Sequence, residues 1–227
     1  MLGTLINTAA VIAGGLTGHF AGSFLKEKQQ DSLITACGVS VMFIAVDGNA
    51  LVSGRAMFVV LCLTIGTLIG EIIGIEKGFE HFGEWLKAKT GNSSDLRFVG
   101  AFVTASLTVC IGAMAIVGAI QDGVSGDYST LAVKSVLDYI IITVMTSSLG
   151  KGCAFSAIPI LLFEGSITLL AGLIAPFLTE AATANLSLVG SILIFCVGIN
   201  LVFGKRVRVA NMLPGVVIAI LAAFLPF

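Results

Sequence analysis

Charged residues are scarce in this chain. Only 11% of its 227 residues are Asp, Glu, Lys or Arg, whereas 57% are apolar. An average soluble protein carries roughly 25% charged residues, and a soluble domain needs that charge to cover its surface. The shortage excludes a soluble enzyme, a nucleic-acid-binding protein and a disordered chain.

Metal-binding and nucleotide-binding patterns are also missing. The closest two of the five cysteines, Cys37 and Cys62, are 25 positions apart, which fits neither a CxxC metal site nor a small disulfide framework. The two histidines have no ligand spacing, and the sequence contains no P-loop. We therefore expect no metal site and no cofactor, and cysteines that act as small apolar side chains in packed helices.

Long uncharged segments take the place of the missing charge. Residues 1–25, 56–70 and 185–204 carry no Asp, Glu, Lys or Arg, and each is long enough, or nearly so, to cross a hydrocarbon core of about 30 Å. We predict an all-α membrane protein, a polytopic bundle of about eight transmembrane helices in a single domain, 1–227. The expected spans are about 2–25, 32–46, 56–75, 98–120, 130–149, 154–178, 186–203 and 212–227. The last span is short, and the count becomes seven if it does not cross.

One segment between the spans is amphipathic. Residues 76–90 place Phe79, Phe82 and Trp85 three or four positions apart, with charged side chains between them. This pattern predicts a helix that lies in the membrane interface, with Trp85 at the level of the lipid headgroups.

Basic residues orient the predicted bundle. Ten of the twelve Lys and Arg residues fall on one side if the loops alternate from the first span onward. The positive-inside rule makes that side cytoplasmic, and it places the N-terminus on the non-cytoplasmic side. The ten are Lys26, Lys28, Lys77, Lys87, Lys89, Arg97, Lys151, Lys205, Arg206 and Arg208.

Two segments are weakly similar to each other. Residues 38–43, GVSVMF, resemble residues 190–195, GSILIF, and each is followed by an asparagine and then by Gly and a basic residue. The two spans run in opposite directions, so a true relation would be an inverted-topology repeat, as in many secondary transporters, with halves 1–90 and 98–227. Chance recurrence of Gly, Ile, Val and Phe is the alternative.

Three charged residues lie deep inside the predicted spans, whereas His19 and Glu71 lie towards the cytoplasmic ends of theirs. Glu164 lies near the middle of the sixth span, and the fifth carries Lys134 and Asp138 on one helix face. Charges at this depth are costly and mark ion or substrate pathways. We predict that Glu164 binds a cation or carries a proton. The alternatives are a hydrogen bond from Glu164 to a neighbouring helix and a structural ion pair between Lys134 and Asp138.

Further polar residues lie near the ends of spans or within them. Amide and carboxylate groups beside glycine could coordinate a cation or hold a polar solute, although ordinary turn chemistry is the alternative. A buried asparagine could instead join helices. The candidate pathway residues are Asp47, Asn49, Gln121, Asp122, Asn7 and Asn200.

Glycines at four-residue spacing form a stripe on the first span. Gly14, Gly18 and Gly22 share one helix face, and such a face lets a second helix approach closely. We expect this packing inside the chain, with packing between subunits of a homo-oligomer as the alternative.

Both ends of the chain carry a family resemblance. Residues 3–18, GTLINTAAVIAGGLTG, resemble the start of a bacterial membrane-protein family with a domain of unknown function, the YqgA/YdfK type. Residues 198–201, GINL, and 208–215, RVANMLPG, are similar to its C-terminal signature. The resemblance implies an inner-membrane protein of bacteria, often guessed to be a transporter, with no established substrate or functional residues.

These observations favour a secondary transporter or channel for a small solute or ion, coupled to a cation or proton through its intramembrane carboxylates. The lipid bilayer and an unknown solute are the expected partners, and no nucleic acid is expected. We expect that the protein is not an enzyme. An intramembrane enzyme that pairs Asp138 with Glu164 is a weaker alternative, and a non-catalytic assembly or partner protein is another.

Overall fold

The computed structural model describes residues 1–46, 56–92 and 94–224, and this part of the chain contains helices but no strand. It confirms the all-α, polytopic membrane class. The α-helices are α1 (Leu2–Gly22), α2 (Glu27–Val46), α3 (Ala56–Ile73), α4 (Ile75–Lys89), α5 (Phe98–Cys110), α6 (Ala113–Val124), α7 (Ser129–Leu149), α8 (Ala157–Leu169), α9 (Ala171–Ile174), α10 (Glu180–Phe203), α11 (Val209–Met212) and α12 (Pro214–Ala222). The 3₁₀-helices are η1 (Lys151–Ser156) and η2 (Ala175–Phe177).

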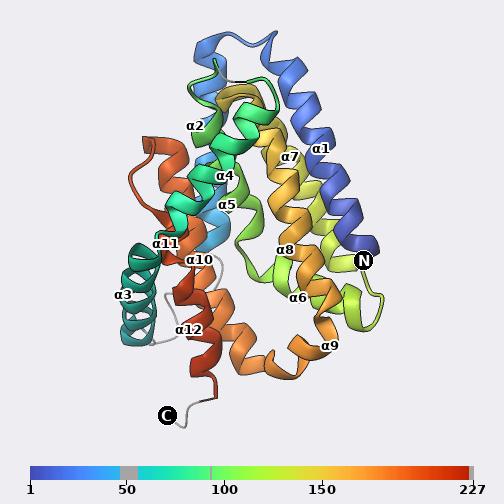
Figure 1. Cartoon of the computed structure of the whole chain (residues 1–227), viewed down its shortest axis with the longest axis vertical. Helices are drawn as coiled ribbons and strands as arrows, with labels where there is room; N and C mark the ends of the chain where they lie inside the picture. The colour runs from blue at the N-terminus through green and yellow to red at the C-terminus, as the bar shows by residue number, and fades with distance from the viewer. Residues whose placement is uncertain (47–55, 93, 225–227) are drawn as a thin grey trace.

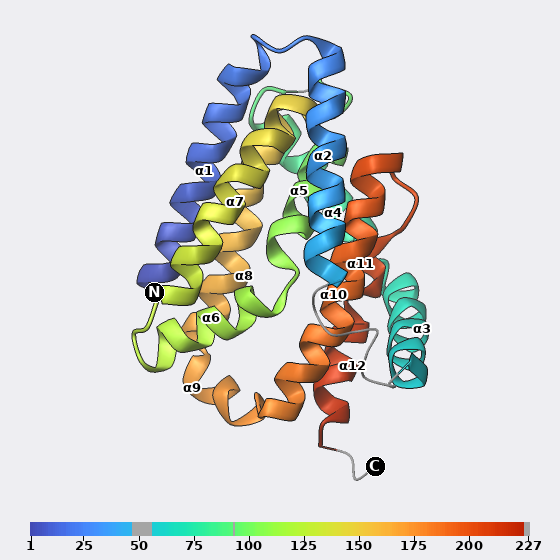
Figure 2. The ribbon, with the colours of Figure 1, turned by 180° about the vertical axis from the view of Figure 1, so that it is seen from behind.

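Helices α1 and α7 run side by side in the same direction, with α8 beside them (Figures 1 and 2). The glycine stripe of α1 makes this contact. A Cβ added at Gly14 would lie 2.6 Å from the carbonyl oxygen of Tyr139, and one at Gly18 would lie 2.2 Å from that of Thr143. The stripe, Gly22 included, therefore packs inside the chain, because only glycine lets the two backbones approach this closely.

Two other helix pairs are antiparallel. Helix α2 contacts α10 at Gly38 and Gly198, and α3 contacts the α11–α12 segment, where a Cβ added at Gly70 would lie 1.9 Å from the carbonyl oxygen of Asn211. These relative directions agree with the alternation of spans that the sequence predicts.

The expected span over 98–120 is wrong as a single helix. The chain leaves the helix at Ile111, whose backbone is extended, and turns at Gly112, whose φ of 144° is strained for any residue with a Cβ. Helices α5 and α6 are bent by 59° across this break. The prediction failed because Gly112 sits in a uniformly apolar run, where hydropathy carries no mark of a bend.

Fewer helices than expected have the length and hydropathy of a full span. In the described part of the chain three do, Ser129–Leu149, Lys151–Leu169 and Glu180–Phe203, and the number rises to five if each bent pair is one span. Helices α1 and α2 are not among them. The apolar helical segment that ends with α12, Val209–Ala222, is also shorter than a full span. The count of eight spans stays a prediction.

The amphipathic helix α4 uses part of its apolar face inside the protein. Phe82 lies 5.8 Å from Phe102 of α5 between ring centroids, and Leu86 is buried. Trp85 is 54% exposed, as a residue at the lipid headgroups would be. Helix α4 also continues from α3 across a bend of 48°. Its interfacial position stays a prediction.

Three of the connections with basic residues lie together at one end of the bundle. The loops α1–α2 and α4–α5 and the α7–η1 junction lie together at the top of Figure 1, and the N-terminus lies toward the other end with the α6–α7 loop. The junction is tightly packed, because a Cβ added at Gly152 of η1 would lie 2.1 Å from the carbonyl oxygen of Phe98.

Candidate functional site

The three intramembrane ionisable residues form one buried cluster. Lys134 and Asp138 on α7 are 6% and 5% exposed, and Glu164 on α8 is fully buried. The Lys134 ammonium forms an ion pair with Oδ2 of Asp138 and lies 3.5 Å from Oε1 of Glu164. The sequence placed Lys134 and Asp138 on one helix face, and the fold brings Glu164 to the same ammonium.

Two further groups complete the cluster. Lys134 Nζ donates a hydrogen bond to the carbonyl oxygen of Val109 at 2.8 Å, and Nδ2 of Asn7 donates to Oε1 of Glu164 at 2.9 Å. Asn7 also interacts with Asp138. The ammonium therefore donates hydrogen bonds to Val109 and Asp138 and forms a longer ion pair with Glu164.

The cluster has one positive charge and two carboxylates. If both carboxylates are ionised, one negative charge is left over in a fully buried place. Oε2 of Glu164 and Oδ1 of Asn7 are also buried acceptors without a hydrogen-bond donor among the described residues. An unsatisfied buried acceptor is unfavourable by about 1–3 kcal/mol. The arrangement therefore has both the charge and the free oxygens to hold one more proton or small cation.

Helix packing explains why these residues meet. The parallel contact of α1 with α7 sets the height of Asn7 beside the Lys134–Asp138 turn. One turn earlier on α1, the hydroxyl of Thr4 lies 3.0 Å from that of Thr168, which in turn donates to the carbonyl oxygen of Glu164. These bonds fix α8 against α1, so Glu164 is held at the level of Asn7.

The break between α5 and α6 lies beside the cluster. Val109 belongs to the last turn of α5, where carbonyl groups have no partner within the helix. The ammonium of Lys134 supplies the missing partner, because it donates a hydrogen bond to the Val109 carbonyl oxygen. Broken helices whose carbonyl ends face an ion are a recurrent arrangement in secondary transporters.

Asp122 and Gln121 lie elsewhere. Oδ2 of Asp122 accepts a hydrogen bond from the backbone N–H of Gly3 at 3.0 Å and forms an ion pair with the Met1 amino group at 2.7 Å. A carboxylate in this position stabilises the N-terminal end of α1. Gln121 accepts a hydrogen bond from the hydroxyl of Thr130 at 2.7 Å, which joins α6 to α7.

Asn200 also lies away from the cluster, at the end of α10. Its Oδ1 accepts from the backbone N–H groups of Arg206 and Val207, each at 2.8 Å, and its Nδ2 donates to the carbonyl oxygen of Val207. It therefore closes the loop after α10. The candidates Asp47 and Asn49 lie outside the described residues.

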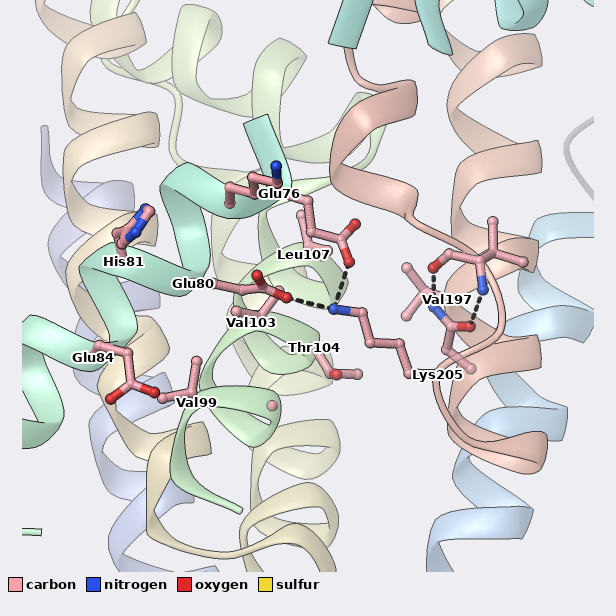
Figure 3. A pocket seen from close by; sticks show the side chains of 14 residues that line it. Glu76, Glu80, His81, Glu84, Val99, Val103, Thr104, Leu107, Val197 and Lys205 are labelled. Atoms are coloured by element: carbon pink, nitrogen blue, oxygen red, sulfur yellow. Dashed lines mark hydrogen bonds and ion pairs between the residues drawn. The ribbon is translucent and has the colours of Figure 1, made fainter. Parts of the chain in front are cut away.

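A second polar site, which the sequence reasoning missed, lies between α4, α5 and the loop after α10 (Figure 3). Nζ of Lys205 lies 2.7 Å from Oε1 of Glu76 and 2.6 Å from Oε1 of Glu80. Partial burial opposes the charge on Lys205, but the bonds to both carboxylates prevail and raise its pKa above the ordinary value. A cavity of about 550 Å³ opens beside these groups.

One feature of the sequence could have indicated this second site. Glu76, Glu80 and Glu84 repeat at intervals of four, so they share one face of α4. The burial of Glu76, at 4% exposure, carries no such signal. It arises because Asn211 of α11 accepts a hydrogen bond from the Glu76 N–H at 2.8 Å and so covers the start of α4.

Comparison with known proteins supports the predicted family. The chain is 29% identical to the uncharacterised membrane protein YdfK of Bacillus subtilis (strain 168) over 223 residues, 96% of this chain and 93% of that protein. It is 30% identical to the uncharacterised protein YqgA of Escherichia coli (strain K12) over 228 residues, 96% and 94% of the two chains. No solved structure matches. Residues 2–224 match the family described as "Protein of unknown function (DUF554)", and the chain belongs to that family of membrane proteins.

Proposed function

We propose that the protein is a secondary transporter for a small solute or ion, coupled to a proton or small cation at the cluster of Asn7, Lys134, Asp138 and Glu164. The buried grouping of one ammonium with two carboxyl groups, in which Oε2 of Glu164 has no donor among the described residues, is the observation that carries the proposal. A single uncompensated charge within a membrane span is unfavourable by about 2.5–3.5 kcal/mol on insertion scales. A bound proton or cation removes that penalty, so the cluster favours binding one.

The cluster also offers a way to release its cation. Lys134 contacts both carboxylates and the Val109 carbonyl at the end of α5. A movement at the α5–α6 break shifts that carbonyl and therefore the ammonium that is bonded to it. The distance between the ammonium and the Glu164 carboxylate then changes, and so does the affinity of Glu164 for a proton or cation. Coupling between a conformational change and ion binding needs this kind of shared contact.

The proposal that the protein is a transporter includes a membrane location and an orientation. We propose the bacterial inner membrane, with the N-terminus on the non-cytoplasmic side, because the loops that carry Lys26, Arg97 and Lys151 gather at one end of the bundle. The antiparallel contacts of α2 with α10, and of α3 with α12, support the same alternation of spans. The similarity of residues 38–43 and 190–195 lies on the touching helices α2 and α10, and an inverted repeat remains part of the proposal.

The test uses purified protein in liposomes on a sensor that records charge displacement. We expect a rapid exchange of Na⁺, K⁺ or pH to give a transient current with wild-type protein for at least one of the three. Glu164→Gln removes the excess charge at nearly constant shape, and it should abolish the current. Glu180→Gln, which changes an exposed carboxylate at the start of α10, is the matched control and should keep it.

Two outcomes would contradict the proposal. One is a wild-type response that Glu164→Gln leaves intact. The other is the absence of any response to all three ions from protein that elutes as a single folded species. A current that saturates with ion concentration favours a carrier, whereas a sustained current favours the channel alternative.

The competing functions have less support. A partner protein docking on the glycine stripe of α1 is disfavoured, because the stripe packs against α7. An enzyme that uses paired carboxylates needs the two groups to lie within roughly 10 Å of each other. Asp138 and Glu164 meet this requirement, because both contact the same ammonium. Asp138 is nevertheless held in an ion pair with Lys134, so its carboxylate is not free to act as a catalytic acid or base. We therefore propose that the protein is not an enzyme.

A further inference from the structure

We infer that the cavity between α4, α5 and the loop after α10 is a binding site for an organic ammonium ion with an apolar group, and that Lys205 is its built-in competitor. The cavity measures about 550 Å³, within the range of about 300–1,000 Å³ typical of small-molecule sites. The inference that this cavity binds an organic ammonium ion does not depend on the proposed function. The further step, that the ligand is the substrate of the transporter, rests on that function.

The two walls of the cavity differ in chemistry. Helix α4 supplies the acidic wall, with Glu76, Glu80 and Glu84 on one face. The facing wall, from α5, α10 and the loop after it, is mostly apolar; it also carries Thr104 and Asn200, and its apolar residues are Val99, Val103, Leu107, Val197 and Val207. A ligand that satisfies both walls carries a positive charge at one end and an apolar group at the other.

The protein already holds an ammonium ion at the acidic wall. The side chain of Lys205 reaches across to the carboxylates of Glu76 and Glu80 (Figure 3). The Lys205 side chain is 56% exposed and that of Glu80 is 42% exposed, whereas that of Glu76 is only 6% exposed. The Glu76 carboxylate is therefore held in place by its surroundings, while the ammonium that it binds sits on a side chain that can move out to solvent.

Glu76 has capacity for a further donor. Its Oε1 contacts Lys205, but its Oε2 is buried and has no hydrogen-bond partner among the described residues. A buried carboxylate oxygen in this state is a strong acceptor. A ligand ammonium has three N–H donors, so it can replace the contact of Lys205 with Oε1, and a small shift of the Glu76 side chain would bring the covered Oε2 to a second N–H of the ligand.

The donor set favours an organic cation over a metal ion. Within the described residues no group of three or more His, Cys, Asp or Glu side chains is placed to hold a metal. The apolar wall would gain nothing from a metal ion, whereas it buries the apolar group of an amine.

The experiment titrates the detergent-purified full chain with 2-phenylethylamine by isothermal titration calorimetry. The uncharged 2-phenylethanol and the anion 3-phenylpropionate serve as matched ligands. We expect saturable binding of the amine at 1:1 stoichiometry and none of the other two. Lys205→Ala should tighten amine binding about tenfold by removing the competitor, and Glu80→Gln should weaken it about tenfold. Both changes are at partly exposed side chains, so the fold should persist. Lys89→Ala, at an exposed residue of the same helix, should have no effect.

Three results would overturn the inference. Equal binding of 2-phenylethanol would show that the apolar wall acts alone. Unchanged amine affinity in Lys205→Ala would remove Lys205 as a competitor. Saturable binding of Mg²⁺ or Ca²⁺ with no binding of the amine would make the site a metal site. All of these binding measurements are made without a membrane gradient. They therefore stay interpretable if the transport proposal fails, and the transport test stays interpretable if the amine does not bind.

Discussion

Asn7 on α1 donates a hydrogen bond to Glu164 on α8 across a sequence separation of 157 residues. The bond joins the first helix of the chain to the carboxylate at the centre of the buried cluster. Neither residue has a partner on its own helix that could replace the other. The contact therefore links the assembly of the bundle to the electrostatics of the proposed coupling site.

Asn7→Ala should destabilise the protein by about 1–3 kcal/mol, because it leaves Oε1 of Glu164 buried with one donor fewer. The free energy of unfolding can be measured by titration with a denaturing detergent and circular dichroism. Thr17→Ala on the same helix, which removes an exposed hydroxyl contact to Tyr139, is the control and should change stability by less than about 0.5 kcal/mol. Equal effects of the two changes would contradict the buried bond.

Lys134→Met should be more damaging, by about 3–5 kcal/mol, because two buried carboxylates lose their only cation in the cluster. The same unfolding titration measures it. Combining Lys134→Met with Asp138→Leu removes one charge of each sign, and it should recover part of the lost stability. Lys151→Met, at an exposed residue, should be nearly neutral. A double variant less stable than Lys134→Met alone would count against the ion pair.

Gly18→Ala should disrupt the α1–α7 contact. The added Cβ would lie 2.2 Å from the backbone carbonyl of Thr143, which cannot move aside as a side chain can, and overpacking of this kind is unfavourable by about 1–3 kcal/mol. Thermal unfolding in detergent reports it. At Gly190 in α10 an added Cβ meets nothing within 4 Å, so Gly190→Ala should be neutral or slightly stabilising. A stable Gly18→Ala variant would refute the close packing.

Asn200→Ala should loosen the loop after α10. The change removes three hydrogen bonds to Arg206 and Val207, so amide hydrogen exchange should rise in residues 205–208 while α10 itself stays protected. Asn92→Ala, which removes only local bonds to Thr90, should leave this loop unchanged. Unchanged exchange at 205–208 in Asn200→Ala would contradict the role of Asn200.

The pH dependence of Lys205 follows from its pKa, which lies above the ordinary value. A raised pKa means that the ion pairs with Glu76 and Glu80 contribute fully below the ordinary lysine pKa and are lost only as the pH rises through the raised one. Amine acylation in mildly alkaline buffer should therefore be slower at Lys205 than at exposed Lys89, as measured by mass spectrometry. Glu80→Gln should speed acylation at Lys205 alone. Equal rates at the two lysines in the wild-type protein would argue against the raised pKa.

Much of the fold class and part of the site could be predicted from the sequence, because charge is costly in a membrane. The scarcity of Asp, Glu, Lys and Arg identified the membrane class, and the same cost singled out Glu164, Asp138 and Lys134. Long-range partners could not be predicted. Nothing local to Asn7 indicates Glu164, and nothing local to Glu76 indicates Asn211. The bend at Gly112 was missed because an apolar run has the same hydropathy whether it is straight or broken.

The parallel pairing of α1 with α7 has a consequence for biosynthesis. Ribosomes add about 5–20 residues per second, and α7 begins more than a hundred residues after α1 ends. The first helix therefore waits on the order of ten seconds before its glycine face meets Tyr139 and Thr143. During that delay its backbone is satisfied, but Asn7 has neither Glu164 nor Asp138 beside it. Helices α2 and α3 wait longer still, because their partners α10 and α12 are made after α7.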